Sequence, residues 1–99
     1  MRIIAVSTLR DFWRAPGHED AQRPLRAWIG VVRRADWSKP TELKADFNTA
    51  DILRDGRVVF DIGGNKYRLV AWINYPYRVL YVRFVGTPRE YDRIDARTV

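Results

Sequence analysis

The apolar positions of this chain change their period near residue 57. Before that point they recur every three or four residues, as in helices that bury one face, and after it they alternate, as in strands. Three alternating runs follow one another: RVVFDI at 57–62, NKYRLVAWI at 65–73 and RVLYVRFV at 78–85. Helices are therefore expected first and strands last.

Two amphipathic helices are predicted in the first third of the chain. RIIAV at 2–6 is typical of a short first strand, and Ser7 is placed to cap a helix that carries Leu9, Phe12 and Trp13. The second helix has Pro24 in or before its first turn, and its apolar stripe consists of Leu25, Trp28, Ile29 and Val32. A short helical segment within 38–47 then leads to the strands.

Two turns connect the three strands. The glycines at 63–64 supply one hairpin turn and residues 74–77 supply the other. Three antiparallel strands after two helices indicate an α+β fold. The 99 residues suggest a single domain, 1–99, with one core. The helices are expected to pack on one face of a small antiparallel sheet.

The hairpin turns also predict the strand register. Closing the second turn sets Arg68 opposite Arg83, and closing the first sets Asp61 opposite Lys66. Both registers turn the same apolar side chains toward the helices: Val58, Phe60, Tyr67, Leu69, Val82 and Phe84.

The opposite face of the sheet is expected to be basic. It carries Asp61, Lys66, Arg68 and Arg83, with Arg57, Val70, Trp72 and Tyr81 farther along the strands. Like charges opposite each other destabilise a sheet by roughly 0.2–1 kcal/mol, and no acid is placed to offset the arginine pair. A bound phosphate would reverse the sign of this effect. The alternative is a solvated face whose cations only maintain solubility.

Composition favours a polyanionic partner. Eighteen Lys and Arg against twelve Asp and Glu give a net charge of +6, and most of the cations are arginine, which suits bidentate phosphate contact. Residues 62–89 contain cations and aromatic residues but no acid. Trp72 and Tyr81 could stack on bases or pack against another chain.

Residue content excludes several kinds of site. Without cysteine there is no disulfide, thiolate zinc site or cysteine nucleophile, and with His18 as the one histidine no metal or other cofactor is expected. The glycine pair is not followed by a nucleotide-binding motif. No run approaches the roughly 20 apolar residues of a membrane span, and no signal peptide is visible, so a cytoplasmic protein without membrane contact is expected.

Three stretches resemble a known family: WSKPTELKADF, RVVFDIGGNKYRLVAWINY and VLYVRFVGTPREYDRIDA. They are similar to the HigB-type toxins of bacterial type II toxin–antitoxin modules, within the RelE-like superfamily. The resemblance implies helices on one face of the sheet, an open active face and a short C-terminal helical turn. It implies a metal-independent endoribonuclease that cuts mRNA on the translating ribosome. A HigA-type helix-turn-helix antitoxin would hold it inactive and provide its one, indirect, connection to DNA.

The resemblance also implies roles for residues of the basic face. Attack of the RNA 2′-OH on the adjacent phosphate needs a base, charge stabilisation and an acid for the leaving 5′-oxygen. Because arginine is not a plausible base, Arg68 and Arg83 are assigned to the phosphate. Lys66 is assigned to the phosphate or to proton transfer, and Tyr91 to the base or to stacking. Further RNA-backbone contacts are expected from Lys44, Arg57 and Arg89.

One position departs from the family pattern. Typical members read GTHxEYD, whereas this chain reads GTPREYD, with Pro88 in place of the histidine. Proline has no titratable group and no backbone N–H, so an attenuated nuclease is expected. Two alternatives stay open: a RelE-like fold kept as an antitoxin partner and co-repressor, and a general RNA- or ribosome-binding protein.

Overall fold

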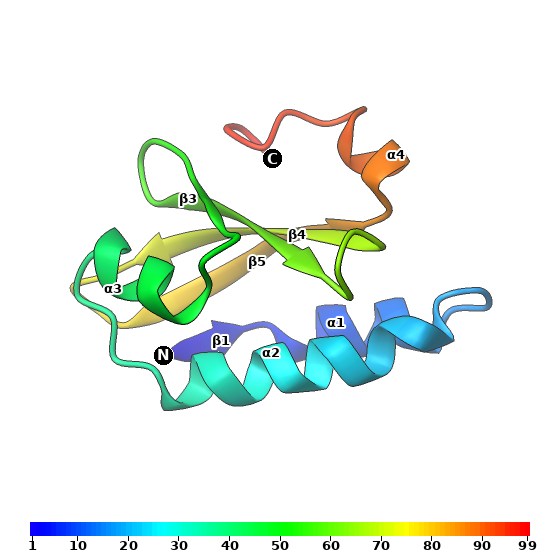
Figure 1. Cartoon of the computed structure of the whole chain (residues 1–99), viewed down its shortest axis with the longest axis horizontal. Coiled ribbons are helices and arrows are strands. Elements are labelled where there is room, and N and C mark those ends of the chain that lie inside the picture. The colour runs from blue at the N-terminus through cyan, green and yellow to red at the C-terminus, as the bar shows by residue number, and fades with distance from the viewer.

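The computed structural model describes residues 1–99 and consists of four α-helices, one 3₁₀ turn and five strands. In chain order these are β1 (Arg2–Ile4), α1 (Val6–Arg14), the 3₁₀ turn (Glu19–Ala21), α2 (Gln22–Arg34), α3 (Pro40–Asp46), β2 (Asp51–Ile52), β3 (Arg57–Ile62), β4 (Tyr67–Asn74), β5 (Val79–Gly86) and α4 (Pro88–Tyr91). Helices α1 and α2 lie on one side of the sheet, and α4 with the end of the chain lies on the other (Figure 1). The predicted α+β class and its short C-terminal helix are confirmed.

The sheet has the strand order β1-β5-β4-β3-β2. Strands β3, β4 and β5 form the antiparallel centre that the two hairpin turns predicted. The expected first strand, β1, pairs parallel to β5 at one edge, and β2, which the sequence did not indicate, pairs with β3 at the other. None of the helices combines the length and the apolar character that crossing a membrane requires.

The apolar stripes of α1 and α2 are buried against this sheet. All four predicted stripe residues of α2 are buried, as are Leu9 and Trp13 of α1. Trp28 meets Phe60 of β3 edge to face, with ring centroids 5.3 Å apart. The first helix does not use Ser7 as its cap, because it begins at Val6, after Ala5, and has no side-chain cap. Burial of its apolar stripe, and not a side-chain cap, therefore stabilises α1.

Arg68 has different neighbours from those predicted. It lies opposite Asp61 of β3 because the first hairpin turn spans four residues, 63–66, instead of two. It lies opposite Gly86 of β5 because the second turn also spans four residues, 75–78, and β5 contains a bulge. The Arg68 guanidinium and the Asp61 carboxylate form an ion pair at 3.2 Å. The predicted arginine pair therefore does not form, and the expectation that no acid offsets these arginines is wrong for Arg68.

A β-bulge in β5 adds one residue to the shift in register that the longer second turn produces. Val70 lies opposite Phe84, but the next residue of β4, Ala71, lies opposite Val82, so Arg83 has no partner on β4. An extra residue in one strand reverses the faces of the side chains on its two sides. Val82 packs against the helices as predicted, whereas Phe84 faces away from them.

Candidate nucleic-acid interface

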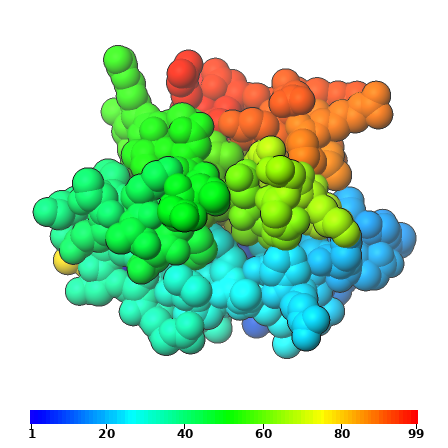
Figure 2. All heavy atoms as spheres, in the orientation of Figure 1, coloured from blue at the N-terminus to red at the C-terminus, as the bar shows by residue number.

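The face of the sheet away from the helices is covered, not open as the family resemblance implied. Residues 94–99, here called the C-terminal segment, turn back over it, and in the space-filling view the end of the chain lies against the residues that lead into β3 (Figures 1 and 2). Ala96 of this segment is 7% exposed and forms a second apolar cluster with Val59 and Val70. Five partly buried residues complete the cluster: Leu53, Phe84, Tyr91, Ile94 and Val99.

Two of the predicted RNA-contacting arginines meet at the C-terminal segment. Arg83 donates from Nε to the main-chain oxygen of Val99 at 3.1 Å, and Arg57 donates from Nη1 to the same oxygen. Beside them the half-buried rings of Trp72 and Tyr81 pack on each other with centroids 5.2 Å apart. Two guanidinium groups from different strands thus converge on one oxygen atom, as they would on a phosphate oxygen.

Arg68 lies at the other end of this face. Its partner Asp61 is four residues along β3 from Arg57, which corresponds to about 13 Å at roughly 3.3 Å per residue. The apolar row of Val59, Val70 and Phe84 lies between the two ends. The arginines therefore lie at two separate ends of the face, Arg57 with Arg83 at one and Arg68 at the other. The C-terminal segment crosses the apolar row between them.

Helix α4 follows β5 at the Arg68 end and is closed by a capping box. The Thr87 hydroxyl accepts from the Glu90 backbone N–H at 3.2 Å, and the Thr87 N–H donates to Glu90 Oε1 at 2.8 Å. That backbone hydrogen bond lowers the pKa of the Glu90 carboxyl. Pro88 occupies the first turn, where no helix hydrogen bond needs its missing N–H.

Tyr91 and Arg89 project from the same short helix. The Tyr91 ring is half-buried, 6.5 Å from the ring of Phe84, so it borders the second apolar cluster. Arg89 is exposed and forms no hydrogen bond or ion pair. Tyr91 is thus the predicted proton-transfer residue that lies on the basic face.

Two predicted site residues lie elsewhere. Lys66 pairs with Asp20 at 2.9 Å, on the helical side, and the Tyr67 hydroxyl donates to the same carboxylate. The hydrogen bond from Tyr67, followed by that from Lys66, lowers the pKa of Asp20. The hydrogen bond to Asp20, followed by burial, raises the pKa of Tyr67 to about 12. Lys44 donates to the main-chain oxygen of Ala50 after α3. Neither lysine joins the converging arginines.

Sequence reasoning missed the cations that flank the C-terminal segment. Arg54 and Arg97 line a cavity of about 600 Å³ together with Ile52 and Leu53. The sequence predicted only a short helical turn near the end of the chain, and the signal for a segment that packs on the sheet was the apolar pair Ile94 and Val99. Nowhere in residues 1–99 do three His, Cys, Asp or Glu side chains gather closely enough to hold a metal ion.

Comparison with known proteins decides the family. Residues 21–94 match the family model of the HigB toxins, described as the RelE-like toxic component of a toxin–antitoxin system. This chain belongs to the HigB toxin family. The mRNA interferase toxin HigB of Escherichia coli strain K12 is 32% identical over 98 residues, 97% of this chain and 92% of that protein. The mRNA interferase HigB of Escherichia coli O6:H1 is 29% identical over 89 residues, 82% and 86% of the two chains.

Membership of the HigB family confirms the resemblance of the three sequence stretches and the RelE-like fold. A toxic component of a toxin–antitoxin system implies an antitoxin partner. The two arginine groups, the aromatic pair Trp72 and Tyr81, and α4 then become the candidate RNA-binding parts of a HigB-family toxin.

Proposed function

We propose that this HigB-family toxin is an mRNA interferase, a ribosome-dependent endoribonuclease that cuts mRNA in the cytoplasm and thereby inhibits translation. The relatives of 32% and 29% identity carry that name. The structural observation that carries the proposal is the convergence of Arg57 and Arg83 on one main-chain oxygen. If a phosphate oxygen replaced that main-chain oxygen, both guanidinium groups would still donate a hydrogen bond.

In the proposed mechanism the RNA 2′-OH loses its proton and attacks the adjacent phosphate, and the 5′-oxygen of the next nucleotide leaves and takes up a proton, which produces a 2′,3′-cyclic phosphate and a 5′-hydroxyl. Arg83 and Arg57 stabilise the charge that develops on the phosphorane. Arg68 binds a neighbouring phosphate after its ion pair with Asp61 has broken. Tyr91 is the candidate for proton transfer on this face, since arginine stays protonated and so cannot serve as the base. Lys66 would take part only after leaving Asp20. Arg89 and Lys44 are proposed to contact the RNA backbone.

We further propose that the antitoxin partner is a HigA-type helix-turn-helix protein. It would hold the toxin inactive and bind DNA for the complex. A chain with net charge +6 favours binding to an acidic protein surface. Co-expression with the adjacent reading frame, followed by co-purification, tests this part of the proposal.

The nuclease activity is tested by inducing the chain in cells and mapping new RNA 5′ ends. Cuts confined to translated messages, together with growth arrest, are expected for the native chain. The Arg83→Ala variant should give neither. New ends that appear equally in untranslated RNA would contradict ribosome dependence, and their absence would contradict the nuclease.

A second candidate function is favoured by Pro88 and by the covered basic face. A RelE-like fold without the family histidine, whose arginines are already bonded within the chain, could serve as a binding partner and co-repressor with little nuclease activity. Growth without arrest on induction, with an intact antitoxin complex, would support this candidate. RNA or ribosome binding without cleavage would instead indicate a general binding protein.

A further inference from the structure

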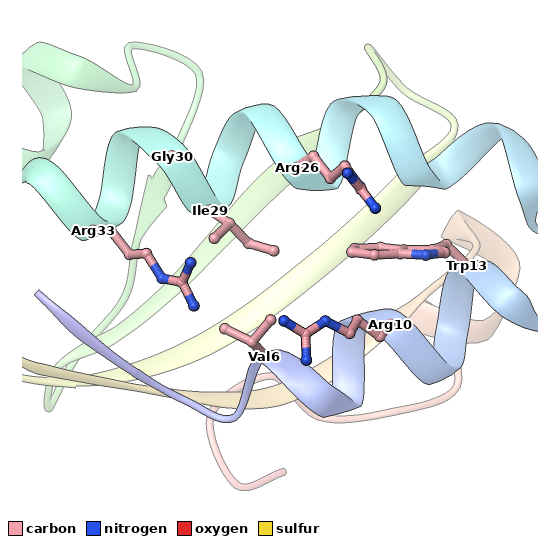
Figure 3. Close-up of a pocket in the computed structure, with 7 residues that line it drawn as sticks. All are labelled: Val6, Arg10, Trp13, Arg26, Ile29, Gly30 and Arg33. Atoms are coloured by element: carbon pink, nitrogen blue, oxygen red, sulfur yellow. The ribbon is translucent and has the colours of Figure 1, made fainter.

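A groove between α1 and α2 lies on the side of the sheet opposite the converging arginines. Three arginine side chains extend toward it, Arg10 from α1 and Arg26 and Arg33 from α2 (Figure 3). Its volume is about 320 Å³, and the rest of its lining is Val6, Trp13, Ile29 and Gly30. We call these seven residues the interhelical groove.

The arginines of the interhelical groove lack acidic partners. Arg10 and Arg33 are exposed, and their side chains take part in no hydrogen bond or ion pair. Arg26 lies over the Trp13 ring at 5.5 Å and within 3.2 Å of the amide of Gln22, neither of which carries a charge. The sequences of α1 and α2 contain only one acid, Asp11, beside their arginines. The positive charge of the groove is therefore not neutralised within the chain.

The floor of the groove is apolar and is kept open by a glycine. Gly30 lies inside α2, where glycine costs roughly 1 kcal/mol relative to alanine. No close packing within the chain requires it, because an added Cβ would meet only the Arg34 side chain, at an ordinary 3.6 Å. Glycine at this position leaves space beside Ile29 and Trp13 that a side chain would fill.

We infer that the interhelical groove docks an acidic segment of the antitoxin. Carboxylates of that segment would pair with Arg10, Arg26 and Arg33, and one apolar side chain would lie on the floor at Gly30. This inference rests on the proposed function, which supplies the partner. It adds the site and the chemistry of the docking segment.

A protein segment fits this groove better than RNA does. Trp13 is only 6% exposed and Arg26 covers its ring, so no aromatic face is free for base stacking. The volume is at the lower end of the roughly 300–1,000 Å³ of ligand pockets, which suits a few side chains. An apolar floor inside a rim of cations matches an acidic segment with an apolar anchor.

The test measures binding of the native chain and three variants to the helix-turn-helix protein encoded by the adjacent reading frame. Arg26→Glu with Arg33→Glu reverses charge in the groove, and Arg14→Glu with Arg23→Glu makes the same charge change outside it. Reversal in the groove is expected to weaken binding about 100-fold or more, whereas the matched control changes it less than about fivefold. Gly30→Met fills the groove without changing charge and should weaken binding at least about tenfold.

Thermal melting of each variant shows that it is folded, and Gly30→Met should melt no lower than the native chain because methionine favours a helix. Equal binding by the native chain and both groove variants overturns the inference while the toxin–antitoxin pairing stands. Failure of the native chain itself to bind overturns both. Loss of ribosome binding with unchanged antitoxin binding in the groove variants also overturns it and assigns the groove to nucleic acid.

Discussion

The two basic surfaces of this chain differ in what their arginines already bind. On the sheet face, Arg57 and Arg83 donate to a main-chain oxygen of the C-terminal segment, and Arg68 pairs with a carboxylate. In the interhelical groove, Arg10 and Arg33 bind nothing within the chain. An external anion must replace an internal acceptor on the first surface, whereas the second is available at once. Positive charge alone therefore does not rank the two surfaces as binding sites.

The largest effect is expected at Pro88, beside the sheet face. Pro88→His should raise cleavage of mRNA on programmed ribosomes, since an imidazole with an ordinary pKa near 6.5 can contribute roughly 10²–10⁴-fold as acid or base. The Thr87 capping box does not depend on the proline, so α4 should survive. Equal rates for the native chain and the variant would show that proton transfer here needs no group at this position.

Loss of one converging donor should have the next largest effect. Arg83→Ala is expected to lower the cleavage rate by about 10²–10³-fold, as removal of a transition-state donor does. Its stability should change little, because the residue is exposed and has no strand partner on β4. The control is Arg14→Ala, outside both surfaces. A large drop in melting temperature without loss of single-turnover rate would make Arg83 structural.

Release of the C-terminal segment would test the internal competition directly. Ala96→Gln places a larger polar side chain in the second apolar cluster and should detach the segment, at a cost of roughly 1–3 kcal/mol in stability. RNA affinity, measured by fluorescence titration, should then rise up to about tenfold. Thr98→Gln, at an exposed position, is the control. Weaker RNA binding would mean that the segment is part of the RNA site.

The Arg68–Asp61 pair should contribute modestly to stability. Because the carboxylate neutralises the arginine, Arg68→Ala should destabilise the chain by about 0.2–1 kcal/mol, not stabilise it as an unpaired arginine cluster would. A double-mutant cycle with Asp61→Asn in urea unfolding isolates the pair. A coupling energy of zero would mean that Asp61 does not hold Arg68, which would then be free to bind an external anion.

The smallest effect concerns the helical side. A depressed pKa means that Asp20 stabilises the fold above its unfolded value of 3.8 and loses this contribution as pH falls through the folded value. Asp20→Asn should therefore lower the melting temperature at pH 7, and the difference should shrink as the pH falls below 3.8. Cleavage at pH 7 should not change. If cleavage rises, release of Lys66 has brought it into the RNA site.

Local patterns predicted the helices well because their burial is periodic. The stripe of α2 is buried along its whole length, and the hairpins lie where the turn residues placed them. The predicted strand register was wrong because an alternating pattern does not show how long a turn is. Nor does it show that Arg83 lacks a partner on the neighbouring strand. The second apolar cluster could not be predicted either, since Ala96 is distant in sequence from Val59 and Val70. The strand pairing predicted for the candidate site was thus wrong, and the roles assigned to its residues stay predictions.

The bulge in β5 has a consequence for protein design. Val82 and Val85 pack on the helical core, while Phe84, between them, serves the second cluster. One strand of ordinary alternating sequence thereby supplies apolar contacts to two different layers. The alternation of faces is reset at Arg83, the residue that has no partner on β4. A designer who copied the residues of this face onto a regular sheet would direct either Phe84 or Arg83 to the wrong side, because neighbouring residues of a regular strand face opposite ways. The transferable unit is the strand with its irregularity, not the list of side chains.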